Sequence, residues 1–295
     1  MASSTPPAGP RPRLTAPAGA VFRLHRGAPS LGPGSWPLIR SSLTAPFSHR
    51  PVALGAGWLP RGVVSTEPLK ETVRRVVPSG WAEHPNLWIV ACDYATGRRV
   101  AFGRSDAPDA ELADAVAASC AIPGFYRPVE IATRPYVDGG LWSTSNLDIL
   151  RDAELDLVLC LNPTSSLHCT PARSPGARIA EAVRRQSGRR LGWESRRLRS
   201  AGTEVVLIQP TEEDLAVMGA NLMSRRNRNP VIQTAIRTVT DQLRGAGVGE
   251  RLAELPRAEP HRLSRPAGPP SSWPSGLLPG RGAVSLLEQE NGQHR

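Results

Sequence analysis

The chain has 295 residues and a formal net charge of +10, enough length for one large α/β domain with tails or for two small domains. Lys70 is the single lysine, and arginine supplies the other basic charges in a chain rich in alanine, proline and glycine. We attribute the positive charge to this compositional bias. Because the sequence has no cluster of aromatic residues on which bases could stack and no nucleic-acid-binding motif, we expect no nucleic-acid partner. No apolar run approaches the roughly 18 residues of a membrane span, so we expect a cytoplasmic protein.

Prolines and glycines concentrate at the two ends of the chain. Residues 1–57 form a low-complexity segment rich in proline, glycine and arginine, and residues 246–295 have a similar composition. Such segments lack the apolar burial that offsets the entropy of ordering a chain. We therefore expect a disordered C-terminal tail and one folded domain over residues 58–245.

The first half of this domain alternates helix and hairpin signals. A proline in the first turn and apolar residues on one face predict a helix within 65–78. Two β-rich runs around Ala95-Thr96-Gly97 predict a hairpin over 86–103. An alanine-rich helix within 109–123, stopped by Pro123, and a second hairpin over 129–140 follow.

The second half begins with Asn146, expected to cap a short helix. Residues 155–163 form a continuous apolar run, typical of a strand buried on both faces. An arginine-rich helix within 178–200, a buried strand within 203–210 and an interrupted helix within 214–243 complete the order. Strands alternating with helices predict an α/β fold with a largely parallel sheet and helices on both faces.

Asp138 is the candidate catalytic residue. It ends an apolar strand, where a carboxylate would face a crevice at the edge of a sheet. Gly139 and Gly140 follow, and they permit a turn that leaves space beside the carboxylate. The pattern also fits a structural turn aspartate.

The four cysteines have no CxxC spacing, and no histidine lies at ligand spacing from them. No nucleotide loop or cofactor motif is present either. We therefore expect reduced thiols, no metal site and no cofactor.

Two motifs carry a family resemblance: "AVAASCAIPGFYRPVEI" and, closely after it, "YVDGGLWSTSNLDIL". Together with "LPRGVVSTEPL" upstream and "GTEVVLIQPTEEDLAVMG" downstream, they resemble the patatin-like phospholipases, in particular the bacterial branch. The resemblance implies a three-layer α/β/α sandwich. It also implies a serine-aspartate dyad that hydrolyses lipid or phospholipid esters, with Asp138 as the aspartate and Gly139 and Gly140 completing its turn.

The nucleophile is left unassigned. The family's glycine-rich oxyanion loop and GxSxG elbow should precede residue 58, and neither is found there. The nearest imitation is "APSLG" with Ser30 at its centre, but the surrounding prolines disfavour the helix that an elbow needs.

We therefore expect a domain that is incomplete at its N-terminal side. The first hypothesis is a phospholipase or lysophospholipase-type esterase of which this chain holds only the aspartate. The alternative is a catalytically inactive remnant that binds lipid or a protein partner, with a peripheral contact to an anionic membrane.

Overall fold

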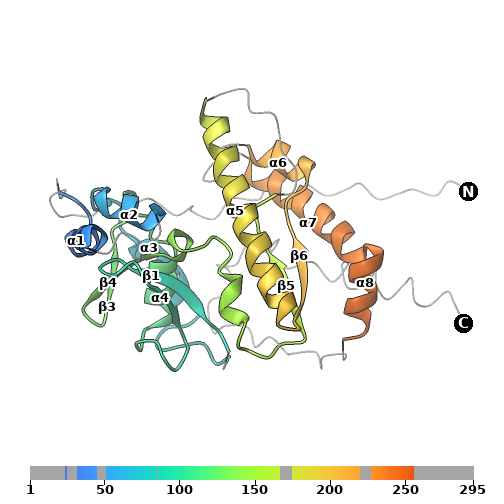
Figure 1. Ribbon diagram of the computed structural model, residues 1–295, viewed down its shortest axis with the longest axis horizontal. Helices are drawn as coiled ribbons and strands as arrows, with labels where there is room; N and C mark the ends of the chain where they lie inside the picture. The colour runs from blue at the N-terminus through green and yellow to red at the C-terminus, as the bar shows by residue number, and fades with distance from the viewer. Residues whose placement is uncertain are drawn as a thin grey trace, which may run out of the picture.

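The computed structural model describes residues 24, 32–44, 51–84, 86–166, 175–219 and 227–255 (Figure 1). The helices before the second sheet are α1 (Trp36–Thr44), α2 (Pro51–Trp58), α3 (Glu67–Arg74), α4 (Leu112–Ser119), η2 (Gly139–Leu141) and η3 (Leu147–Leu150). The later helices are α5 (Pro175–Ser200), α6 (Glu212–Met218), α7 (Arg228–Arg244) and α8 (Ala246–Ala253). The strands are β1 (Ile89–Asp93), β2 (Arg99–Phe102), β3 (Val129–Ile131), β4 (Arg134–Asp138), β5 (Leu157–Leu161) and β6 (Glu204–Ile208).

The larger sheet has the strand order β2-β1-β4-β3 and is antiparallel throughout. β1 and β2 form a hairpin in which the Asp93 carboxylate accepts hydrogen bonds from the amides of Ala95 (2.8 Å) and Thr96 (3.1 Å). β3 and β4 are joined by Ala132 and Thr133, which both have positive φ (48° and 67°). Positive φ at both central residues is the geometry of the tight hairpin turn that matches strand twist. Both predicted hairpins are confirmed.

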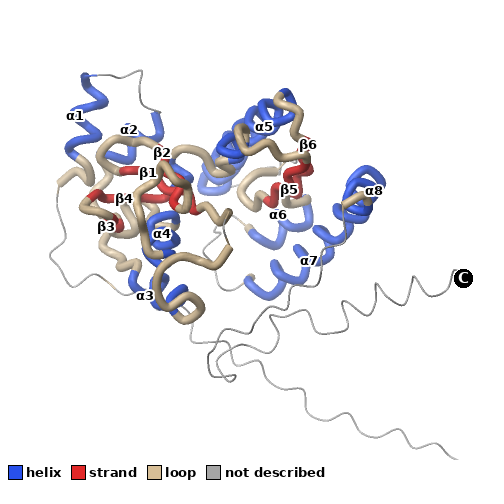
Figure 2. The backbone as a smooth tube through the Cα atoms, turned by 90° about the horizontal axis from the view of Figure 1, so that it is seen from below, coloured by secondary structure: helices blue, strands red, loops and turns tan. Residues whose placement is uncertain are grey.

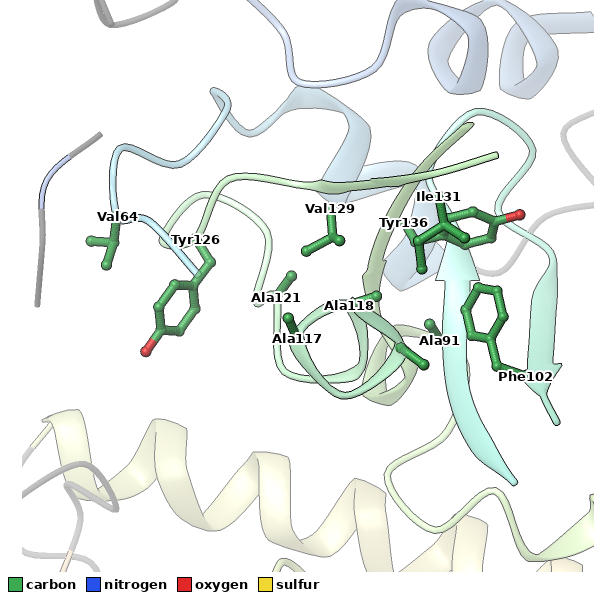
Figure 3. Packing of buried hydrophobic residues seen from close by; sticks show 11 residues of the cluster. Val64, Ala91, Phe102, Ala117, Ala118, Ala121, Tyr126, Val129, Ile131 and Tyr136 are labelled. Atoms are coloured by element: carbon green, nitrogen blue, oxygen red, sulfur yellow. The ribbon is translucent and has the colours of Figure 1, made fainter. Parts of the chain in front are cut away.

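Side-chain alternation divides the apolar residues of this sheet between two faces. Ala91 and Tyr136 point to one face, where the alanines of α4 complete a buried cluster that also contains Phe102 (Figure 3). Cys92 and Val137, the next residues along each strand, belong to a second cluster that includes residues of α1 and α2. The sheet therefore lies between a layer of α3 and α4 and a layer of α1 and α2 (Figure 2).

The smaller sheet consists of β5 and β6, which pair in parallel. These strands lie between α5 and α7 (Figure 2), and Leu191 and Leu198 of α5 pack against Val158 and Val205. On the side of this sheet that faces α7, the two strands differ in solvent exposure. Val206 and Ile208 of β6 are buried, whereas their partners in β5, Leu159 and Leu161, are 41% and 63% exposed. The prediction of a strand buried on both faces is therefore wrong for β5.

The predicted α/β fold is confirmed, with one difference in the sheet. Only β5 and β6 are parallel among the described strands, whereas a single, largely parallel sheet was expected. A hairpin makes its two strands antiparallel by construction, and parallel neighbours need a crossover such as α5. The two hairpins therefore fix β1–β2 and β3–β4 as antiparallel, and the pairing of β1 with β4 is antiparallel as well.

Ordered structure extends beyond the predicted domain limits at both ends. Within residues 1–57, α1 contributes the fully buried Leu38 and α2 contributes the buried Ala56. At the other end, α8 occupies residues 246–253 of the segment that was expected to be a disordered tail. The high glycine and proline content obscured these short apolar stretches.

The described helices include none that combines the length and the apolar character needed to cross a bilayer. The cytoplasmic location and the peripheral membrane contact stay predictions.

The contact between Phe102 and Tyr136 gives a test of the larger core. Phe102 is fully buried, and its ring meets Tyr136 edge-to-face at a centroid distance of 5.0 Å. We expect Phe102→Ala to lower the free energy of unfolding by about 3–5 kcal/mol, because it leaves a cavity between the sheet and α4. Urea denaturation measures this change. Phe125→Ala, at a residue that is 40% exposed, is the control, and an equal loss there would contradict the assigned core.

Candidate active site

Asp138 is the last residue of β4, at the point where the chain leaves the larger sheet. It lies opposite Ala91 in the β1–β4 pairing, and its amide donates to the carbonyl of Ala121 just beyond α4 (3.0 Å). Its carboxylate accepts a hydrogen bond from the amide of Gly140 (2.6 Å). The backbone of Asp138 is thus fixed from two sides, and its side chain is held over the turn that follows.

Glycine is required at positions 139 and 140 because neighbouring atoms lie too close to leave room for a Cβ. Neither has a positive φ, so the turn does not depend on a left-handed conformation. A Cβ on Gly139 would lie 2.5 Å from the carbonyl oxygen of Val90, and a Cβ on Gly140 would lie 2.9 Å from Asp138 Oδ1. The first glycine lets β4 turn against β1, and the second keeps the space beside the carboxylate open.

Burial raises the pKa of Asp138 above the usual range of an aspartate. Partial removal of the carboxylate from water disfavours its charged form, and the hydrogen bond from Gly140 opposes this effect only in part. A carboxylate with a raised pKa is a stronger proton acceptor than an exposed one. Such a group is suited to general-base chemistry at neutral pH.

Cys120 lies next to Asp138 and was not singled out from the sequence as a site residue. It follows α4 and is exposed as a residue. Loss of solvent around the thiol raises its pKa, and the charge of Asp138 raises it further. The thiol therefore stays protonated at neutral pH, where it is a poor nucleophile.

The loop between η2 and η3 is anchored by Asn146. This residue has a φ of 48°, and its side chain makes no hydrogen bond to the amides of η3, so its prediction as a side-chain cap is wrong. Its Nδ2 instead donates to the carbonyl oxygens of Ser143 (2.5 Å) and Gly139 (3.3 Å). Asn146 thus ties the loop to the residue that follows Asp138.

No described serine hydroxyl donates a hydrogen bond to the Asp138 carboxylate. Ser30, the nucleophile candidate from the sequence, lies outside the described residues. The Ser65 hydroxyl accepts a hydrogen bond from the amide of Glu67 (3.2 Å) in the turn that precedes α3. The site in the described residues is therefore one carboxylate, its turn and a neighbouring thiol.

Residues 31–151 match the family model described as patatin-like phospholipase. This part of the chain is patatin-like. The match contains Asp138, Gly139 and Gly140 and ends directly after η3. It supports a lipid hydrolase and a lipid substrate. The domain expected from the motifs overlaps the match over residues 58–151, and its extension to residue 245 stays a prediction.

No metal centre is built by the patatin-like region in the part that the structure describes. Across the described ranges, no three histidine, cysteine, aspartate or glutamate side chains gather as metal ligands do. Asp93, a second acidic residue at a strand end, holds the β1–β2 turn and pairs with Arg134 (3.1 Å). Its contacts are those of a structural residue.

Gly139→Ala tests the close approach of β4 to β1. The added Cβ would overlap the carbonyl oxygen of Val90, which is backbone and has little freedom to move. We expect the substitution to lower the free energy of unfolding by about 1–3 kcal/mol. Gly55→Ala is the matched control, because that glycine lies within a helix with open space around it. Equal stability of the two variants in urea denaturation would show that this approach is not as tight as described.

Asp138→Asn tests the burial of the carboxylate through the pH dependence of stability. Because the pKa of Asp138 is higher in the folded than in the unfolded chain, its ionised form favours unfolding. We expect the variant to unfold at a higher urea concentration than the wild type at neutral pH. This advantage should shrink as the pH falls through the folded pKa and vanish below the unfolded pKa. A pH-independent difference would contradict the raised pKa.

Proposed function

We propose that this protein is a patatin-like lipid acyl hydrolase, a phospholipase or lysophospholipase-type esterase, in which Asp138 is the base of a serine-aspartate dyad. The observation that carries the proposal is the partly buried carboxylate of Asp138, held over a two-glycine turn inside the residues that match the family. Its raised pKa suits a group that must accept a proton.

The chemistry follows from the requirements of acyl transfer. Asp138 accepts the hydroxyl proton of the serine as the serine oxygen forms a bond to the ester carbonyl carbon. The resulting oxyanion needs amide donors, and its collapse breaks the bond to the alcohol, which leaves with the proton from Asp138. Water then attacks the acyl-enzyme with Asp138 again as the base, which releases the fatty acid and restores the serine.

The serine itself is not assigned. Ser30 stays the candidate from the sequence, although its neighbours disfavour an elbow. The thiol of Cys120 is close to the same carboxylate, but its raised pKa makes it a poor substitute. Mapping the nucleophile by experiment is therefore part of testing the proposal.

An apolar rim formed by Leu59 and the segment after α4 supports an acyl substrate; this segment begins directly after Ala121, whose carbonyl accepts the amide of Asp138. The rim consists of Leu59, Ile122 and Phe125, whose exposed fractions are 44%, 45% and 40%. Ile122 is the second residue after Cys120, and Leu59 lies against Gly124 in the same loop. Exposed apolar side chains grouped near a polar centre are typical of surfaces that bind apolar ligands.

Asp138→Asn tests the proposed activity. Loss of a general base lowers a rate by about 10²- to 10⁴-fold, and we expect a loss of this size in kcat for a lysophospholipid and a short-chain phospholipid. Asp106→Asn is the matched control, because Asp106 is an exposed acid that pairs with Arg104 away from the site. Full hydrolysis by Asp138→Asn would overturn the role of this residue.

A fluorophosphonate probe identifies the nucleophile in the same experiment. Because no nucleophile elbow was found in the sequence, we expect no serine to be labelled; labelling of one serine, located by peptide mapping and weaker in Asp138→Asn, would assign the nucleophile and overturn that expectation. Absence of both hydrolysis and labelling would contradict the proposed hydrolase activity and favour the alternative of a lipid- or partner-binding protein.

A further inference from the structure

Glu194 of α5 is the one glutamate among the described residues that has no solvent exposure. Its Oε2 accepts hydrogen bonds from the Ser145 hydroxyl (2.5 Å) and the Leu147 amide (3.0 Å). Its Oε1 accepts from Arg190 Nε, one turn earlier on the same helix (2.6 Å). Two of these three partners, Ser145 in the loop after η2 and Leu147 at the start of η3, follow Asp138 in the chain, although α5 lies outside the residues that match the family.

The path from Glu194 to Asp138 is short. Asn146 lies between the two residues that Glu194 binds, and its side chain donates to the carbonyl of Gly139. Gly139 directly follows Asp138 and is pressed against the backbone of Val90. Movement of the 145–147 segment would therefore reach the Asp138 turn through the Asn146 side chain and through Ser143, whose amide also donates to the carbonyl of Gly139 (3.3 Å).

Other contacts hold the same loop on α5 and on the larger sheet. Thr144 is hydrogen-bonded to Ser187, which lies two turns before Glu194 on the same face of α5. Asp148 pairs with Arg99 of β2 (2.6 Å) and lies 3.9 Å from the guanidinium of Arg190. The loop is thus fixed between the antiparallel sheet and α5.

A buried glutamate is energetically unfavourable at this position unless its carboxylate is hydrogen-bonded. A carboxylate that is taken out of water loses its hydration, so a buried charge needs close hydrogen-bonding partners. Leu191 and Leu198 occupy the same side of α5 and pack against the β5–β6 sheet, so an apolar residue would serve packing alone. The polar partners of Glu194 explain why a carboxylate stands there.

We infer that Glu194 is a positioning residue for Asp138, acting through Ser145, Leu147 and Asn146 on the turn at Gly139. This inference rests on the proposed function, since Asp138 is the residue that is positioned. Complete burial excludes contact between Glu194 and a substrate.

The first measurement reads the Asp138 turn without relying on hydrolysis. The pH profile of Cys120 alkylation by iodoacetamide, followed on its own peptide by mass spectrometry, reports the nearby charges. Asp138 raises the pKa of this thiol, and Tyr126 is the other titratable group that interacts with it. Asp138→Asn should shift the profile to lower pH, which calibrates the readout.

Glu194→Leu should shift the Cys120 profile toward that of Asp138→Asn, because the turn loses its anchor. Ser145→Ala, which leaves the carboxylate paired with Leu147 and Arg190, should shift it less in the same direction. Glu194→Gln keeps an acceptor for both loop donors and should restore most of the wild-type profile. Glu181→Gln makes the same charge change on an exposed part of α5, where Glu181 pairs with Arg185, and should change nothing.

Hydrolysis gives the second measurement. A displacement of a reacting group by about 1 Å costs up to roughly 100-fold in rate, so Glu194→Leu should lower kcat by about 10- to 100-fold with little change in KM. Wild-type profiles and rates in both Glu194→Leu and Ser145→Ala would overturn the inference, as would an unshifted Cys120 profile in Asp138→Asn. If the wild type hydrolyses no lipid, the proposed function fails, and the alkylation profile alone decides whether Glu194 sets the turn.

Discussion

The antiparallel pairing of β1 with β4 is the constraint on which the site depends. This register places Asp138 opposite Ala91 and brings Gly139 against the carbonyl of Val90. It also sends alternate side chains of both strands into two separate apolar clusters, one under each helical layer. A shift of one residue would exchange the two faces and separate Gly139 from Val90, so core packing and site geometry are specified together.

Local chemistry made much of this fold readable from the sequence. Hairpin turns, the alanine-rich α4 and the Asp-Gly-Gly turn each depend on a few neighbouring residues, and the structure has all three where they were expected. The share of parallel strands was overestimated because each apolar run was assigned as a strand without considering which strand it would pair with. Pairing partners decide strand direction, and the two hairpins had already fixed two of the strand pairs as antiparallel.

What the sequence did not reveal is long-range. Asn146 looked like a helix cap, yet its partner is the carbonyl of Gly139, seven residues earlier. Glu194 sits in a run of arginines, yet it has no solvent exposure. No periodicity indicates that a glutamate will be buried, because the reason for its burial is a loop nearly fifty residues away. Cys120, whose thiol pKa is raised by burial and by the charge of Asp138, was not identified as a site residue for the same reason.

The span of these contacts has a consequence for how the molecule assembles. The two hairpins and α4 form from neighbouring residues and can appear early, whereas Glu194 meets Leu147 and Ser145 across separations of 47 and 49 residues. Contacts that close long loops form late in folding. We therefore expect the carboxylate turn to reach its final shape only after β6 has paired with β5 and α5 has docked. During synthesis, the chain would have to emerge from the ribosome well past residue 200 before the Asp138 turn could take its final shape.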